Sequence, residues 1–163
     1  MKLALHLPDE AAQLAFGQRF APWLMGCAGV IFLIGNLGAG KTTLARGILR
    51  GLGVSGIVRS PTYTLIEPYI INEWTVYHLD LYRLSDPEEL EYLGWRDLLA
   101  EGGLLLIEWP ERGAAVLPAP ELTIEITPDG SGRRVQMSGQ GRGTAWLEQL
   151  GSGGIADPAP WLC

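Results

Sequence analysis

The sequence GNLGAGKT at residues 35–42 fits the phosphate-binding pattern G-x-x-x-x-G-K-[ST], known as Walker A. An apolar, β-branched run at residues 30–34 precedes it and predicts a buried strand. Residues 43–50 follow with apolar side chains at helical spacing, and Gly51 or Gly53 is expected to end that helix. A strand, a glycine loop and a helix in this order are the context that phosphate binding requires.

The residue types in this loop match that chemistry. Glycines leave room for the backbone to close around a phosphate chain, with its N–H groups and the helix N-terminus facing the anion. Lys41 is expected to reach the β- and γ-phosphates, and the Thr42 hydroxyl to ligate Mg²⁺. We therefore expect ATP contacts at Asn36, Leu37, Gly38, Ala39, Gly40, Lys41, Thr42 and Thr43.

Length and composition restrict the remaining possibilities. With 163 residues, 47% of them hydrophobic, the chain is expected to form one P-loop ATPase domain over residues 1–150, followed by a flexible, Gly- and Pro-rich tail at 151–163. The longest apolar runs are too short to span a bilayer, and the N-terminus turns acidic before a signal-peptide core is complete. Cys27 and Cys163 suggest neither a disulfide framework nor a metal cluster, so the cytoplasm is the natural compartment. The net charge of −6 argues against a protein that binds nucleic acid on its own. Any role in RNA metabolism is expected to act through a partner protein.

Two carboxylates follow predicted strands. Asp80 ends the run at residues 74–79, and Glu108 ends the apolar run at residues 104–107 in the manner of a Walker B acid, where Asp is more usual. We expect Glu108 to be the second metal contact beside Thr42, and Asp80 to orient the attacking water. Lys41, Asp80 and Glu108 are thus the catalytic candidates, with Asp80 also near the nucleotide. The sequence leaves open the division of roles between the two acids, and whether Glu108 is only a solvated carboxylate.

Four further features have two interpretations each. The segment SPTYT at residues 60–64 is either a surface turn or a switch-like loop whose hydroxyls approach the γ-phosphate. Glu10, after the predicted N-cap Asp9, either complements a helix dipole or lies near ATP. Arg133 is either solvated or meets adenine or phosphate, and His78 is a packed, hydrogen-bonded histidine in preference to a base.

The hydrophobic periodicity predicts the remaining elements. Residues 65–71 and 74–79 read as a hairpin, and Ser85 with Glu88 as a capping box for a helix that ends near Leu93. Further strands are expected at 2–7, 122–127 and 134–138, and short helices at 97–100 and 144–150. The fold class is α/β, a three-layer P-loop NTPase-like fold with a mixed, mainly parallel sheet and an antiparallel hairpin.

Four motifs together resemble the TsaE family, the bacterial ATPases of tRNA threonylcarbamoyladenosine biosynthesis, over about residues 8–150. They are GNLGAGKTT at 35–43, SPTYTL at 60–65, YHLDLYRL at 77–84 and IEWP at 107–110. The resemblance implies ATP and Mg²⁺ as cofactors and TsaD and TsaB as partners. It also implies a role in resetting the complex that modifies the adenosine beside the tRNA anticodon, with tRNA reached only through that complex. Asn36 stands where Asp is commonest in the family, which removes a charge but leaves the backbone of the loop unchanged.

Two other classes of P-loop protein are alternatives. A small-molecule kinase would need an arginine-rich lid, but the arginines at 46, 50, 83 and 96 form no run. A GTP-dependent switch would need the guanine-selecting pattern Asn-Lys-x-Asp, which the sequence lacks. Nor is an arginine finger for the γ-phosphate evident in the sequence. Arg83 is the candidate nearest in sequence to Asp80, and the alternative is that it faces a partner. The ATPase is therefore expected to be weak without its partners.

Overall fold

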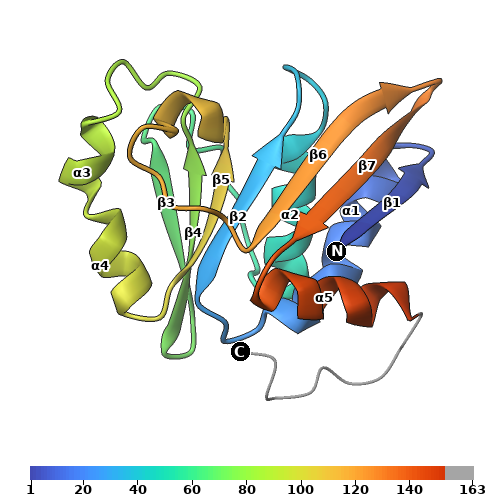
Figure 1. The fold of residues 1–163 in the computed structure, drawn as a ribbon, viewed down its shortest axis with the longest axis horizontal. Coiled ribbons are helices and arrows are strands. Elements are labelled where there is room, and N and C mark those ends of the chain that lie inside the picture. Colours follow the sequence, from blue (N-terminus) through green and yellow to red (C-terminus); the bar gives the residue numbers. More distant parts are fainter. Residues whose placement is uncertain (153–163) are drawn as a thin grey trace.

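The computed structural model describes residues 1–152, in which helices cover both faces of one seven-stranded sheet (Figure 1). Of the tail predicted at residues 151–163, Gly151 still belongs to a helix, and residues 153–163 lie outside the described part. Cys163, one of the two cysteines considered for a disulfide, lies there as well. Within residues 1–152, no helix combines the length and the apolar character that crossing a membrane requires.

The elements follow the predicted order with small shifts at their ends. The strands are β1 (Lys2–Leu7), β2 (Gly29–Ile34), β3 (Ile66–Ile71), β4 (Trp74–Asp80), β5 (Leu104–Glu108), β6 (Leu122–Asp129) and β7 (Gly132–Gly139). The helices are α1 (Glu10–Phe20), α2 (Lys41–Gly51), α3 (Glu89–Leu93), α4 (Trp95–Ala100) and α5 (Arg142–Gly151), with 3₁₀ turns η1 (Ala21–Leu24) and η2 (Pro110–Gly113).

The strand order is β1-β7-β6-β2-β5-β4-β3. The four neighbours β6, β2, β5 and β4 are parallel, whereas β7 and β3 run against them and β1 runs against β7. Most strands therefore point the same way, which confirms the mixed, mainly parallel sheet with its antiparallel β3–β4 hairpin. One edge of the sheet is β3, and an exposed proline, Pro68, lies within this strand.

Two layers of helices explain why the central strands are so apolar. Helices α1 and α2 cover one face of the sheet, and α3 and α4 cover the other (Figure 1). Side chains of β5 alternate between the two cores: Leu104 and Leu106 belong to the α1/α2 side, Leu105 and Ile107 to the α3/α4 side. A parallel strand covered on both faces has no solvated side, so the run LLLIE is buried throughout.

Helix starts show one confirmed prediction and one error. Asp9 caps α1, because its carboxylate accepts a 2.8 Å hydrogen bond from the N–H of Ala12. The predicted capping box of Ser85 with Glu88 is wrong. The reciprocal bonds form one residue later, where Asp86 accepts from the Glu88 N–H (3.0 Å) and Glu89 accepts from the Asp86 N–H (3.2 Å). Asp86 and Glu89 have the same three-residue spacing, but their bonds lie in the turn before α3, whose N-cap residue Glu88 makes no side-chain capping bond.

Helices α1 and α2 approach each other through glycines. A Cβ atom on Gly17 would lie 2.8 Å from both the Ile48 nitrogen and the Leu44 oxygen, and one on Gly47 would collide with the Leu14 oxygen. The two backbones are thus in direct contact, and this contact sets the position of the helix that begins at Lys41.

We expect Gly47→Ala to destabilise the protein by about 1–3 kcal/mol, because an added methyl forces the two backbones apart. Helix propensity alone predicts the opposite effect, an increase in the free energy of unfolding of about 1 kcal/mol. Urea unfolding of the variant measures the difference. The matched control is Gly151→Ala in α5, where the nearest atoms to an added Cβ lie 3.9 Å away. A Gly47→Ala protein as stable as wild type would contradict the close contact.

Candidate functional site

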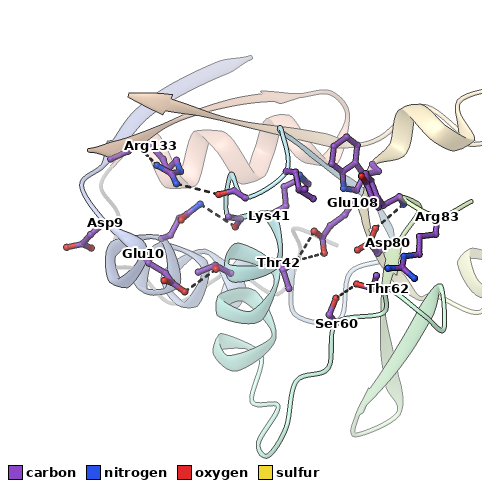
Figure 2. Close-up of a pocket in the computed structure, with 18 of the residues that line it drawn as sticks. Asp9, Glu10, Lys41, Thr42, Ser60, Thr62, Asp80, Arg83, Glu108 and Arg133 are labelled. Atoms are coloured by element: carbon purple, nitrogen blue, oxygen red, sulfur yellow. Dashed lines mark hydrogen bonds between the residues drawn. The ribbon is translucent and has the colours of Figure 1, made fainter. Parts of the chain in front are cut away.

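Three strands of the parallel sheet end at one place. β2 leads into the glycine loop, Glu108 ends β5 beside Leu33 of β2, and Asp80 ends β4 directly opposite Glu108. A pocket of about 600 Å³ opens there (Figure 2). Among its lining residues are Glu10, Leu37, Gly38, Gly40, Lys41, Thr42, Thr43, Asp80, Glu108 and Arg133, all predicted from the sequence.

The loop has the shape that its glycines allow. Gly40 has φ +101°, in the left-handed region, and a Cβ there would run into the side chain of Gln13. A Cβ on Gly35 would lie 2.8 Å from the Ile126 oxygen. Side chains at these two positions would collide with the elements packed around the loop, so the loop keeps this shape only with glycines there.

Lys41 lies inside this loop with 4% of its surface exposed. Its Nζ donates to the carbonyls of Gly35 (2.5 Å) and Asn36 (3.0 Å) and lies 4.2 Å from the centre of the Trp109 ring. Burial lowers the pKa of the Lys41 ammonium below its usual 10.5, although the nearby carboxylates of Glu108 and Asp80 act in the opposite direction. A bound anion would favour the charged form of this lysine.

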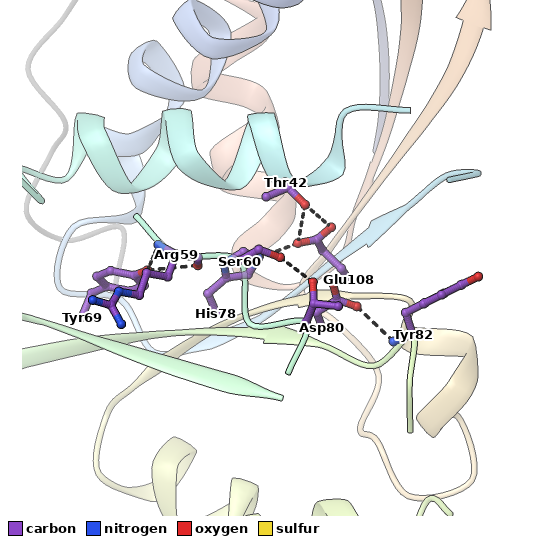
Figure 3. A network of polar contacts seen from close by, with 9 residues as sticks. Thr42, Arg59, Ser60, Tyr69, His78, Asp80, Tyr82 and Glu108 are labelled. Carbon is purple, nitrogen blue, oxygen red and sulfur yellow. Dashed lines mark hydrogen bonds and ion pairs between the residues drawn. The ribbon is translucent and has the colours of Figure 1, made fainter. Parts of the chain in front are cut away.

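The Glu108 carboxylate connects two elements. The Thr42 hydroxyl, in the first turn of α2, donates to Oε1 (2.9 Å) and Oε2 (3.1 Å), and His78 Nε2 of β4 lies 2.6 Å from Oε2 (Figure 3). Glu108 is 2% exposed, which excludes the solvated carboxylate that the sequence left open. His78 is fully buried, and its prediction as a packed, hydrogen-bonded histidine is confirmed.

Asp80 has different surroundings from Glu108. Its Oδ1 accepts a 3.0 Å hydrogen bond from the Tyr82 N–H, which closes a tight turn after β4. Burial raises the pKa of the Asp80 carboxyl above its usual 3.8; the Tyr82 hydrogen bond opposes this effect, and the Glu108 charge adds to it. Glu108 and Asp80 are thus neighbouring carboxylates with different partners, and such pairs are suited to different chemical roles.

The site offers few protein ligands for a metal. Within residues 1–152, no group of three or more His, Cys, Asp or Glu side chains is arranged to hold a metal ion. Thr42 and Glu108 give a hydroxyl and a carboxylate oxygen, which are ligands that Mg²⁺ accepts. Such a pair fits a Mg²⁺ ion whose other ligands are waters and substrate phosphates.

The remaining predicted residues lie on opposite walls of the pocket. Figure 2 shows Glu10 and Arg133 on one side of Lys41 and Thr42, with Asp80 and Arg83 on the other. The Glu10 carboxylate accepts a 3.4 Å hydrogen bond from the Thr43 hydroxyl.

Arg133 is not simply solvated, because its Nε donates to the carbonyl of Ala39 (3.1 Å). Asn36 and Ala39, also predicted to contact ATP, are outside the set of described residues that line the pocket. They still shape the loop, since the Ala39 N–H donates to the Asn36 carbonyl (3.0 Å).

The hydroxyl segment is divided between two environments. Ser60 and Thr62 line the pocket, with their hydroxyl oxygens 2.6 Å apart. Thr64 is outside the set of described residues that line the pocket, and its hydroxyl donates to Glu67 (3.0 Å). Tyr63 is 84% exposed, and the Arg83 guanidinium lies 4.6 Å from the centre of its ring.

The sequence did not single out several residues that line this pocket, and two of them, Gln13 and Trp109, contact the loop or its lysine. Gln13 lies at helical spacing with the buried Phe16 and Phe20, so a polar residue on an apolar face was the available signal. Trp109 has a left-handed backbone (φ 56°), and its ring packs 4.9 Å from that of Tyr82 and against Lys41. An unfavourable backbone conformation beside a site is typical of functional positions, but the sequence carries no sign of it.

A family model described as "Threonylcarbamoyl adenosine biosynthesis protein TsaE" matches residues 7–135. The chain belongs to the TsaE family. A relative from Haemophilus influenzae is 45% identical over 142 residues, 85% of this chain and 90% of the relative. One from Borreliella burgdorferi is 37% identical over 141 residues, 84% of this chain and all of the relative. Both are named tRNA threonylcarbamoyladenosine biosynthesis protein TsaE.

A solved structure supports the same assignment. The crystal structure of Bacillus subtilis YdiB superposes with a TM-score of 0.74 and 28% sequence identity, covering 94% of this chain and 96% of that one. The P-loop-like fold that the sequence predicted is therefore confirmed, and so is the resemblance to the TsaE family.

We expect Asp80→Asn, without nucleotide, to raise the free energy of unfolding at neutral pH. Because the folded pKa of Asp80 is raised, ionising this carboxyl costs stability. That cost is absent below the unfolded value near 3.8 and grows as pH rises to the folded pKa. The gain from Asn should thus be full at neutral pH and shrink as pH falls. Urea unfolding from about pH 8 to about pH 4 measures it, with the exposed Glu101→Gln as control. A gain that does not change with pH would contradict this explanation.

Proposed function

We propose that this chain binds and hydrolyses ATP with Mg²⁺ in the cytoplasm, as the ATPase subunit of the machinery that forms threonylcarbamoyladenosine in tRNA. In this proposal it resets or activates a complex of TsaD and TsaB and reaches tRNA only through them. The observation that carries the proposal is the hydrogen bond between Thr42, directly after the glycine loop, and the buried Glu108 carboxylate. A hydroxyl and a carboxylate meet at the helix N-terminus that phosphates would face.

Each residue of the site has a role in this reaction. Lys41 would exchange its bonds to two loop carbonyls for bonds to phosphate oxygens. Thr42 and Glu108 would hold Mg²⁺, which would supply positive charge to offset the negative charge that develops on the phosphates. The loop amides and the start of α2 would bind the remaining phosphate charge.

Asp80 is the candidate for orienting the attacking water. It lines the pocket, and the Tyr82 N–H anchors one of its oxygens. A raised pKa makes its carboxylate a stronger base than a solvated aspartate, which suits it to accept a proton from water.

The small-molecule kinase is the weaker candidate. Among the described residues that line the pocket, the arginines are Arg83 and Arg133. Arg133 binds the carbonyls of the loop, and Arg83 stacks on Tyr63 at the rim. Neither has the arrangement of a lid over a second substrate.

We expect Glu108→Gln and Asp80→Asn to fail in different ways. Loss of the metal contact should raise the Mg²⁺ concentration needed for half-maximal activity. Loss of the water-orienting group should lower kcat while Mg²⁺–ATP still binds. Steady-state phosphate release at varied Mg²⁺ distinguishes the two.

Lys41→Ala is the reference variant for loss of the phosphate site. It should abolish hydrolysis without unfolding the chain. Unchanged kinetics in Lys41→Ala would refute the proposed ATPase, and the reverse pattern in the two acid variants would exchange their roles.

We expect the isolated chain to hydrolyse ATP slowly and TsaD with TsaB to stimulate it strongly. Both arginines that line the described pocket have other partners, Tyr63 for Arg83 and the loop carbonyls for Arg133, and an arginine finger supplied in trans raises turnover by about 10³–10⁵. Hydrolysis measured with and without those proteins tests this, and Arg83→Ala shows whether the rim arginine is needed for stimulation. Fast turnover by the chain alone, unaffected by the added proteins, would instead favour the kinase.

A further inference from the structure

The glycine loop is held from outside by a glutamine of α1. Gln13 is 3% exposed, and its Nε2 donates to the carbonyls of Ala39 (3.1 Å) and Gly40 (3.3 Å). Its neighbours on the buried face of α1 are Phe16, Gly17 and Phe20, so an apolar residue would suit packing at this position. Burying an amide costs free energy unless it is hydrogen-bonded, and the loop carbonyls are the partners that this amide has.

An arginine from the opposite end of the chain reaches the same carbonyls. Arg133, at the start of β7, donates from Nε to Ala39 (3.1 Å) and from Nη2 to Gly38 (3.4 Å). Its Nη1 also donates to the Gly132 carbonyl (2.9 Å), which fixes the guanidinium plane. Two side chains from distant elements thus bind three successive carbonyls, at Gly38, Ala39 and Gly40.

Holding a carbonyl also fixes the next N–H. The C=O of one residue and the N–H of the next share a planar peptide unit and point in opposite directions. Anchoring the carbonyls of Ala39 and Gly40 therefore directs the N–H groups of Gly40 and Lys41 away from Gln13 and Arg133. These are the amides that a phosphate-binding loop needs to aim at its anion.

We propose that Gln13 and Arg133 are positioning residues that set the peptide orientations of the loop before nucleotide binds. This inference rests on the proposed ATP site and adds the residues that preorganise it. Preorganised donors need not be ordered during binding, so the pair acts on affinity for the phosphates. Turnover of bound ATP depends on Asp80 and Glu108 and should change little.

The test is binding of ADP without Mg²⁺, measured by calorimetry, together with hydrogen exchange of the amides in residues 35–42. Gln13→Leu removes the donor, and Gln13→Glu replaces it with an acceptor of the same shape facing the carbonyls. We expect affinity to fall about three- to tenfold for Gln13→Leu and further for Gln13→Glu, from the net value of one to two hydrogen bonds. Amide exchange in the loop should accelerate before ADP is added, and kcat at saturating ATP should stay near that of wild type.

Two comparisons separate positioning from general damage. Gln18→Glu, at an exposed position on the same helix, should leave affinity and exchange unchanged. Because Gln13 and Arg133 share the Ala39 carbonyl, Gln13→Leu and Arg133→Leu should be non-additive in a double-mutant cycle.

Three results would overturn the inference. Unchanged affinity and exchange in both Gln13 variants would show that the bonds to the loop have no effect on it. An equal loss of ADP affinity in Gln18→Glu would show that any change in α1 weakens binding, whether or not it removes a bond to the loop. Wild-type protein that binds no ADP would refute the ATP site itself, and the inference would fall with it.

Discussion

The buried carboxylate of Glu108 is the constraint on which the site depends. A charged group that is 2% exposed is strongly unfavourable unless hydrogen bonds compensate for lost water. The compensation comes from Thr42 on α2 and His78 on β4, so the carboxylate joins the end of β5 to the first turn of the loop helix and to the neighbouring strand. Removing either partner would leave a buried charge incompletely paired, and the three elements would lose their common anchor.

The glycine loop is fixed from two directions around this anchor. On the inside, the Lys41 ammonium binds the carbonyls of Gly35 and Asn36. On the outside, Gln13 and Arg133 bind the carbonyls of residues 38–40. The close contact of α1 with α2 through Gly17 and Gly47 belongs to the same arrangement, because it brings Gln13 within reach of the loop. The geometry of the phosphate-binding loop therefore depends on how closely the two helices pack.

Much of this could be predicted from the sequence, for a physical reason. The glycine loop, the apolar strand run before Glu108 and the run before Asp80 are local patterns, and the parallel sheet brings their ends together without further information. What could not be predicted depends on contacts between distant residues. Nothing local shows that Arg133 reaches Ala39, or that Trp109 has a left-handed backbone and packs on Lys41. The sequence predicts a capping box at Ser85 because Ser and Asp have similar capping preferences, whereas the structure has the reciprocal bonds at Asp86 and Glu89.

The exposed proline in β3 has a consequence for how the protein behaves at high concentration. β3 is an edge of the sheet, and an open edge is a template on which strands from other molecules can pair. Pro68 has no N–H to offer to such a strand, and prolines in edge strands place that position toward solvent. The ladder of hydrogen bonds is therefore interrupted in the middle of this edge. A strand added at this edge would lack one of its backbone hydrogen bonds, which disfavours association of molecules through β3.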